Sequence, residues 1–370
     1  MQTDPTQRYY SPDYATARDR FREAVAARAG SLDSLELAAK GPAGESLSLD
    51  IGWFGAQKPR RVLVHSCGLH GVEAFAGSAL QLQWLAQGNH PLTDDAAIIL
   101  IHVLNPYGMA WLRRFNENNV DLNRNFLAMG EPFAGVPPGY VKLNRFLNPE
   151  TPPSNDLFYL RAAALVARHG LASLRQAIAG GQHEYPKGLF FAGSSLQEGP
   201  AKLEKYLTDH LERAERIVAI DVHTGLGRSG DDALLVDGAP ERKAVNQMMR
   251  AAFGESVQEL KTTGMAYEVR GAQHQMYYRL FPGAQVYFAS QEFGTYHPIR
   301  VLEALRAENR WHHHGSGTVE HPTKAALREV FNPNAVKWRR TILQRGETVL
   351  KQGLALAFEQ SVKKTAATTG

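Results

Sequence analysis

The feature that most constrains this sequence is a pair of apolar strands separated by one apolar helix, in its first third. Residues 60–68, RRVLVHSCG, are apolar without alternation, which is typical of a strand buried on both faces of a sheet. Residues 73–88, EAFAGSALQLQWLAQG, show a helical pattern that ends in glycine, and residues 96–105, AAIILIHVLN, form a second buried strand. This strand–helix–strand order predicts a βαβ unit and therefore an at least partly parallel sheet.

The rest of the chain continues the same alternation. Strand-like runs recur at residues 216–223, 233–238 and 283–290, and helical patterns cover residues 13–30, 156–179, 200–214 and the tail from residue 334. We find no internal repeat and no clear linker. The sequence therefore predicts one α/β domain over residues 1–370, with a mixed, largely parallel, twisted central sheet covered by helices on both faces. Its core spans about residues 10–331, and residues 332–370 form a helical tail.

One segment interrupts this pattern. Residues 127–154 are rich in proline, glycine and asparagine, and they read as a long excursion over the surface. A structureless loop of this length inside a compact domain is usually functional. We therefore expect this segment to cover one edge of the sheet.

Composition argues against several classes of protein. The 370-residue chain has a formal net charge of only +4, and its basic residues are scattered among nearly as many acidic ones. The sequence therefore does not indicate the concentrated basic surface that binds nucleic acid. Its one cysteine, Cys67, excludes an intramolecular disulfide and suits a reducing compartment. The N-terminus lacks the apolar core of a signal peptide, and no apolar run is long enough for a membrane helix. We expect a cytoplasmic protein; its oligomeric state is not readable from the sequence.

Polar residues of a kind that binds metals follow three of the predicted strands. His70 and Glu73 come after the strand 60–68, His223 ends the strand 216–223, and Glu292 follows the strand 283–290. Ligands collect outside the carboxyl ends of strands in open α/β sheets. Catalytic zinc commonly takes two histidines and one glutamate, and Asp221 or a backbone carbonyl could orient such ligands from behind. Taken singly, each residue has an ordinary alternative, such as a strand-end histidine satisfied by hydrogen bonds or a carboxylate in a salt bridge.

A fourth cluster lies in the segment RRFNENNVDLNRNF. It carries Arg113, Arg114, Asn123 and Arg124 within twelve residues. A guanidinium beside an amide suits bidentate capture of a carboxylate. The alternative is a solvated loop stabilised by asparagine and aspartate turns.

The order of these motifs resembles that of the zinc carboxypeptidase superfamily. That order is H-G-V-E, then D-L-N-R-N-F, then a strand ending in D-V-H-T-G, then a strand ending in Q-E-F-G-T. The superfamily includes the pancreatic carboxypeptidases and the aspartoacylase and succinylglutamate desuccinylase group. The chain most resembles a bacterial branch of uncharacterised carboxypeptidase-like proteins, which shares the stretches HGVEAFAGSALQ and YSPDYATARDRF. The likeness covers about residues 10–331.

This resemblance implies a role for each motif residue. It implies one zinc ion per chain, held by His70, Glu73 and His223, and it implies Glu292 as the general base that takes a proton from the attacking water. Arg114 looks like the arginine that stabilises the oxyanion, although Arg113 could take that place. Asn123 and Arg124 match the pair that holds the substrate's free carboxylate. For the family's mobile active-site tyrosine, the candidates are Tyr267, Tyr277 and Tyr278.

These roles predict a zinc-dependent hydrolase that cleaves an amide next to a free carboxylate, on a peptide or a peptide-like substrate. An alternative is a deacylase that acts on N-acyl amino acids, because it uses the same metal, base and carboxylate clamp. Hydrolysis of an ester or a lactam also stays open. A second alternative, from a different class, is a non-catalytic protein that binds a ligand on the same fold. It predicts a damaged ligand or base position, and the sequence shows none.

Overall fold

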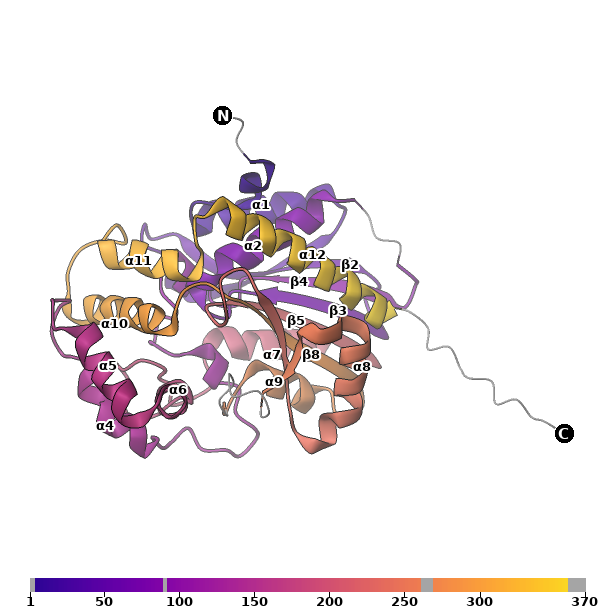
Figure 1. Cartoon of the computed structure of the whole chain (residues 1–370). Coiled ribbons are helices and arrows are strands. Elements are labelled where there is room, and N and C mark those ends of the chain that lie inside the picture. Colours follow the sequence, from indigo (N-terminus) through magenta and orange to yellow (C-terminus); the bar gives the residue numbers. More distant parts are fainter. Residues whose placement is uncertain (1–3, 89–91, 261–268, 359–370) are drawn as a thin grey trace.

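The computed structural model describes residues 4–88, 92–260 and 269–358 of the chain (Figure 1). Its strands form an eight-stranded sheet in the order β1-β2-β4-β3-β5-β8-β6-β7. The strand bounds are β1 (Ser31–Lys40), β2 (Ser46–Gly55), β3 (Arg61–Cys67), β4 (Ala96–His102), β5 (Arg216–Thr224), β6 (Asp232–Val236), β7 (Val257–Glu259) and β8 (Gln285–Phe293).

The centre of the sheet is parallel. Strands β4, β3, β5 and β8 are neighbours in that order, and each runs parallel to the next. Antiparallel pairings occur toward the edges, where β2 joins β4 and β1, and β6 joins β8. The mixed, largely parallel sheet predicted from the sequence is therefore confirmed. Because β3, β5 and β8 share a direction, the residues after them meet at one edge of the sheet.

Helices cover both faces of this sheet, as predicted. The helix bounds are α1 (Tyr14–Ala27), α2 (Ala74–Ala86), α3 (Pro106–Ala110), α4 (Pro138–Leu147), α5 (Phe158–His169), α6 (Leu171–Ala179), α7 (Glu198–His210), α8 (Lys243–Phe253), α9 (Gln273–Leu280), α10 (Pro298–His314), α11 (Pro322–Phe331) and α12 (Val336–Phe358). On one face, α7 and α9 pack against side chains such as Val64 and Ile99. On the other, α1, α2, α8 and α12 pack against side chains such as Leu63 and Ile98. Consecutive strand residues thus face opposite helical layers, which explains the unbroken apolar runs Val62–Val64 and Ala96–Ile101 in the central strands.

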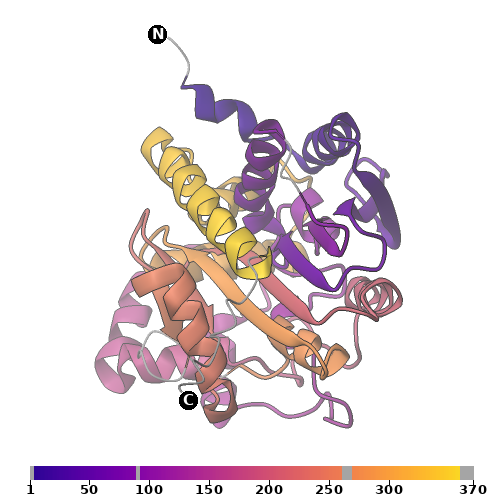
Figure 2. The same ribbon diagram turned by 90° about the vertical axis from the view of Figure 1, so that its right-hand side faces the viewer.

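A third group of helices lies beyond the sheet edge and carries its own apolar cluster. Helices α4, α5, α6, α10 and α11 contribute to this cluster, and they group together at one side of the molecule in Figure 1. Figure 2 shows α12, in yellow, beside α2 on the face of the sheet that these two helices cover. The predicted loop over residues 127–154 is wrong in part, because α4 occupies Pro138–Leu147. Tyr140, Leu143 and Phe146 of α4 are buried, so packing against distant helices stabilises a helix that local composition concealed.

Within residues 4–88, 92–260 and 269–358, no helix combines the length and the apolar character needed to cross a membrane.

Candidate metal centre

The ends of three neighbouring parallel strands bring the predicted metal ligands together. Strand β3 ends at Cys67, three residues before His70, while His223 lies near the end of β5 and Glu292 near the end of β8. His223 and Glu292 are register partners on adjacent strands. His70, Glu73 and His223 are all buried. The cluster therefore forms at the sheet edge where the sequence predicted a site.

A close approach between two backbones positions the His70–Glu73 segment. Gly71 lies against Gly108, and a Cβ atom at Gly71 would be 2.0 Å from the Gly108 carbonyl carbon. The amide nitrogen of Gly71 donates to the carbonyl of Arg114 at 3.1 Å. Only glycine allows the close approach of residue 71 to Gly108, and the hydrogen bond from Gly71 brings Arg114 beside His70.

The three candidate ligands face a common centre, and one ligand atom from each residue lies within 4.8 Å of the other two. Nδ1 of His70 lies 3.0 Å from Oε1 of Glu73. Nδ1 of His223 lies 3.3 Å from Nδ1 of His70 and 3.3 Å from Oε2 of Glu73. Tetrahedral zinc with bonds of about 2.0–2.1 Å requires its ligand atoms to be about 3.3 Å apart. These residues can hold a metal ion, and the spacing and the donor set fit zinc.

Two buried carboxylates stand behind the histidines and orient them. Oδ2 of Asp221 lies 2.6 Å from Nε2 of His223, and Oδ1 of Asp221 accepts a hydrogen bond from Oγ of Ser66 at 2.5 Å. Oδ1 of Asp121 lies 3.0 Å from Nε2 of His70. The carboxylate of Asp221 thus holds the ring of His223 with its Nδ1 directed at the centre, and Asp121 does the same for His70. The sequence pointed to Asp221 for such a role, and the structure places it there.

Asp121 is the residue that sequence reasoning missed. Besides His70 it contacts Nε of Arg114 at 3.2 Å, and it accepts a hydrogen bond from the backbone of Asn123 at 3.1 Å. Burial alone would raise the pKa of its carboxyl, but Arg114, Arg124 and His70 outweigh burial and hold the pKa well below the usual range. The available signal was its position in the D-L-N-R-N-F motif, two residues before Asn123.

The charges around the centre keep Glu73 ionised. Burial raises the pKa of a carboxyl, yet His70, His223 and Arg114 together lower the pKa of Glu73 below its ordinary value. The backbone amide of Thr224 also donates to Oε2 of Glu73 at 3.0 Å. A carboxylate that stays charged in the interior is a suitable metal ligand.

Glu292 behaves differently from Glu73. Burial raises its pKa, and the negative charge of Glu73 raises it further, although His223 opposes the shift. Glu292 is only half-buried, since part of its carboxyl faces a cavity. A carboxyl beside an open space, next to the candidate ligands, is placed to accept and return a proton.

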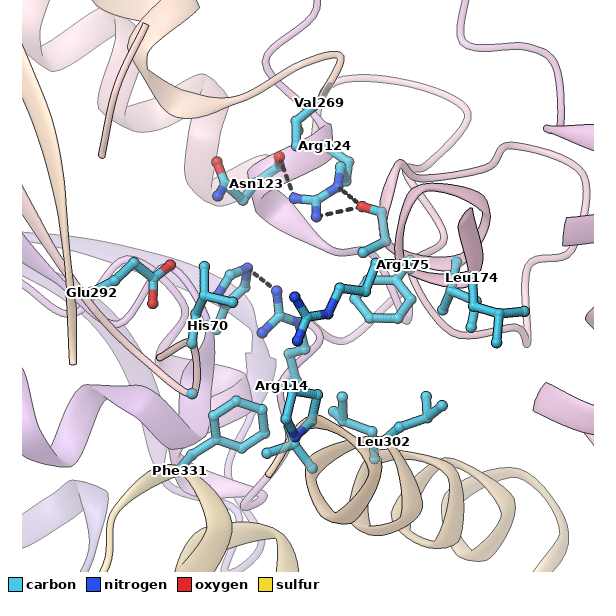
Figure 3. A pocket seen from close by; sticks show the side chains of 18 of the residues that line it. His70, Arg114, Asn123, Arg124, Leu174, Arg175, Val269, Glu292, Leu302 and Phe331 are labelled. Carbon is cyan, nitrogen blue, oxygen red and sulfur yellow. Dashed lines mark hydrogen bonds between the residues drawn. The ribbon is translucent and has the colours of Figure 1, made fainter. Parts of the chain in front are cut away.

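Arg114 lies directly beside the ligands. Its Nη1 donates to Oε1 of Glu73 at 2.8 Å, and its Nη2 lies 2.8 Å from Nε2 of His70 (Figure 3). The guanidinium also sits near the rings of Phe190 and Phe331, with 5.5 and 5.9 Å to the ring centres. These contacts aim a buried cation at the centre, where a developing negative charge would be stabilised.

The structure does not bring Arg113 to this centre. Nε of Arg113 donates to Oε1 of Glu308 at 3.0 Å, and its Nη2 donates to Asn119 at 2.8 Å. Lys324 completes this buried cluster by donating to the same oxygen of Glu308 at 2.6 Å. Arg113 therefore links the loop to helices α10 and α11.

Asn123 and Arg124 do line the cavity beside the centre, but much of their hydrogen-bonding capacity is used within the protein. Nε and Nη2 of Arg124 both donate to the carbonyl of Ala179, and Nη1 donates to the carbonyl of Asn123 (Figure 3). The side-chain oxygen of Asn123 accepts from the backbone of Gln273. The pair thus also fastens α6 and α9 to the loop that carries it.

None of the three candidate tyrosines is placed at the cavity. Tyr267 lies outside the residues that the structure describes. Tyr277 is buried in the core against Phe288, and Tyr278 packs against Arg242, whose guanidinium carbon lies 3.9 Å from the ring centre. Neither of these two lines the cavity.

The cavity that joins these residues has a volume of about 230 Å³. Its floor is formed by His70, Glu73, Arg114 and Glu292, and most of its remaining walls are apolar. A concave, mostly apolar space with a few converging polar groups is typical of a small-molecule site.

Comparison with known proteins gives a family and several distant structural likenesses. Residues 10–345 match the family described as "Protein of unknown function (DUF2817)". No curated protein sequence matches this chain. Similar solved structures are a carboxypeptidase A from Helicoverpa armigera and a candidate metallopeptidase from Shewanella amazonensis. The first is 13% identical with a TM-score of 0.48, and covers 93% of this chain and 73% of the other. The second is 14% identical with a TM-score of 0.47, and covers 93% of both chains.

A third similar structure is a candidate member of the succinylglutamate desuccinylase/aspartoacylase family, also from S. amazonensis. It is 18% identical with a TM-score of 0.38, and covers 75% of this chain and 70% of the other. All three solved structures share less than 20% of their sequence with this chain, and each TM-score lies below 0.5. They are distant, and the chemistry of this chain rests on its own side chains.

Proposed function

This chain belongs to the DUF2817 family, and from that premise we propose that it is a zinc-dependent hydrolase that cleaves an amide bond next to a free carboxylate. One observation carries the proposal. The Nδ1 atoms of His70 and His223 and the carboxylate of Glu73 lie 3.0–3.3 Å apart, and Glu292 stands in register beside His223.

The protein's own residues supply most of the chemical groups that this reaction needs. Zinc, when bound, lowers the pKa of water and polarises the scissile carbonyl. Glu292 accepts a proton from the attacking water as the oxygen bonds to the carbonyl carbon, and it returns that proton to the leaving nitrogen as the carbon–nitrogen bond breaks. Arg114 donates hydrogen bonds to the oxyanion that forms between these steps. The products are a carboxylic acid and an amine.

The helices that enclose the cavity favour a small substrate over a long peptide. A peptidase needs an open groove for a chain, whereas helices α4, α5, α6 and α10 all contribute walls to this cavity. Deacylation of an N-acyl amino acid is therefore our second candidate, and it uses the same groups in the same roles.

The test combines metal content with turnover in two variants. Glu292→Gln is expected to keep about one zinc per chain while losing roughly 10²- to 10⁴-fold in kcat. His223→Ala is expected to lose both the metal and the activity. The exposed residues Glu255 and His169 provide matched controls as Glu255→Gln and His169→Ala. Substrates are a mixed panel of peptides and N-acyl amino acids, with and without a chelator.

Two results would count against the proposal. Equal loss of metal in Glu292→Gln and His223→Ala would mean that base and ligand are wrongly assigned. A purified protein that neither contains zinc nor takes it up would favour a non-catalytic binding protein.

A further inference from the structure

Arg175 is a cation that lines the cavity from helix α6. It is half-buried, and its side chain extends into the cavity in the direction of Arg114 and His70 (Figure 3). In the part of the chain that the structure describes, there is no hydrogen bond or ion pair to Arg175. Holding a cation partly out of water is costly unless an anion pairs with it. Arg175 is therefore placed to bind an anionic group of a ligand.

The two other arginines that line the cavity have acidic partners. Nη1 of Arg114 lies 2.8 Å from Oε1 of Glu73, and its Nε lies 3.2 Å from Oδ2 of Asp121. Nη1 of Arg124 lies 3.8 Å from Oδ1 of Asp121. Of the described arginines at the cavity, Arg175 is thus the one whose charge the protein's own carboxylates leave unbalanced.

The surroundings of Arg175 are mainly apolar. Helices α4, α5, α6 and α10 line this part of the cavity with side chains such as Leu143, Val166 and Leu302. The carboxylates among the described lining residues are Glu73 and Glu292, and both stand at the metal centre instead. Charges attract and repel each other more strongly in an apolar enclosure than in water. A substrate group that carries an anion suits this space, and a group that carries an ammonium does not.

The position of Glu292 indicates which half of the substrate meets Arg175. Glu292 returns its proton to the leaving nitrogen, so the amine half lies on the side of β8, where Ser290 and Leu235 line the cavity. Arg175 enters the cavity from the opposite side of His70 (Figure 3), so the acyl half lies toward Arg175. The free carboxylate of the proposed function belongs to the amine half. The anion that Arg175 can bind is therefore a different group.

We propose that the acyl half of the substrate carries a carboxylate of its own and that Arg175 binds it. The substrate class is then monoamides of dicarboxylic acids, in which a short apolar spacer separates the second carboxylate from the scissile carbonyl. A simple dipeptide is a poor match, because its acyl half carries an ammonium group that Arg175 repels. This inference rests on the proposed function and deepens it, since it concerns the other half of the same substrate.

The charge on the acyl half is tested first on the wild-type protein. The zinc-loaded full chain is assayed with N-succinyl-, N-glutaryl- and N-adipoyl-L-phenylalanine, and each acid is compared with the analogue whose acyl carboxyl is a primary amide. The two members of a pair differ by one charge and have nearly the same shape. At the best spacer length, kcat/KM is expected to be about 10- to 100-fold higher for the acid, as for one hydrogen bond between charged groups. No preference for the acid at any length would refute the inference.

Arg175 is tested by repeating this comparison in a variant. Arg175→Gln is expected to lower kcat/KM for the acid about 10- to 100-fold and for the amide less than threefold. Arg168→Gln, on the exposed side of α5, is the matched control and should change neither value. Thermal unfolding confirms that each variant is folded. Equal losses for acid and amide in a folded Arg175→Gln would mean that Arg175 acts at the metal centre or only in packing, and the inference would be wrong.

Failure of this inference and failure of the proposed function give different results. If the zinc-loaded chain hydrolyses each acid and its amide equally well, the proposed function stands and this inference is wrong. If it hydrolyses none of these substrates, the proposed function fails. Calorimetry on the zinc-loaded wild type and Arg175→Gln then decides whether Arg175 binds the acid more tightly than the amide.

Discussion

Replacing Asp221 by asparagine should weaken metal binding without removing a ligand. Asp221 is fully buried, and its Oδ2 lies 2.6 Å from Nε2 of His223. Its other oxygen accepts a hydrogen bond from Ser66, which fixes the orientation of the carboxylate. Asparagine has nearly the same shape, so Asp221→Asn changes the charge behind His223 far more than it changes the packing.

The expected size of the effect follows from this contact. An amide oxygen facing Nε2 still accepts a hydrogen bond, so His223 keeps its position. The bond changes from charge-assisted, at about 1.5–3 kcal/mol, to neutral, at about 1 kcal/mol. The difference of about 0.5–2 kcal/mol corresponds to roughly 2- to 30-fold weaker zinc binding, which overlaps the roughly 10- to 100-fold found for partners of metal-binding histidines. Ser66→Ala, which removes only the supporting hydrogen bond, should have a smaller effect.

The assay is competition with a chromophoric zinc chelator at neutral pH, on wild type, Asp221→Asn and His223→Ala. Asp95→Asn is the control, since Asp95 pairs with Arg61 at the opposite end of β3. Affinity within twofold of wild type in Asp221→Asn would show that His223 does not depend on its carboxylate. A loss as complete as in His223→Ala would mean that Asp221 is itself a ligand or that the fold has failed, and circular dichroism distinguishes these two causes.

Three further predictions concern catalysis, pH and the backbone. Arg114→Gln should lower kcat about 10²- to 10³-fold with little change in KM, measured by steady-state kinetics on the metal-loaded protein. Burial lowers the pKa of His102 from 6.5 to about 4, so its neutral form stabilises the fold above pH 6.5, and this contribution is lost as the pH falls toward 4. Urea unfolding should show a loss of roughly 2–3 kcal/mol between pH 7 and 4.5 from this residue, and His102→Gln should flatten the dependence by that amount. Gly71→Ala should destabilise the protein and weaken zinc binding, because its Cβ would overlap Gly108, whereas Gly283→Ala, with no heavy atom within 4 Å of its Cβ, should do neither in thermal unfolding and zinc titration.

The sheet and the place of the site were predictable from one physical signal, whereas the roles of the site residues came from the resemblance to the zinc carboxypeptidase superfamily. A strand buried on two faces must be apolar throughout, so the polar residue that follows it marks the strand's end. His70, His223 and Glu292 all occupy such positions, and parallel neighbours bring those ends to one edge.

Other parts of the structure depend on contacts that a single sequence does not reveal. The segment 127–154 contains α4, whose buried face packs against α5, α6 and α10 rather than against its own neighbours in the chain. The choice between Arg113 and Arg114 is of the same kind, because adjacent side chains point in different directions. What settles it is Glu308, nearly two hundred residues away, which binds Arg113 and leaves Arg114 at the centre.

The metal centre and the apolar part of the cavity are built from different secondary-structure elements, so substitutions can affect one without the other. The metal ligands and Glu292 lie at or just after the ends of central strands, whereas the apolar part of the cavity, which we call the chamber, is lined by helices α4, α5, α6 and α10, whose apolar side chains form one cluster. Arg124 joins the two parts through the carbonyl of Ala179 at the end of α6. Substitutions within α5 and α6 should therefore change which substrate is accepted while leaving zinc affinity intact. Substitution of Arg124 should instead disturb the chamber and the loop beside the metal together.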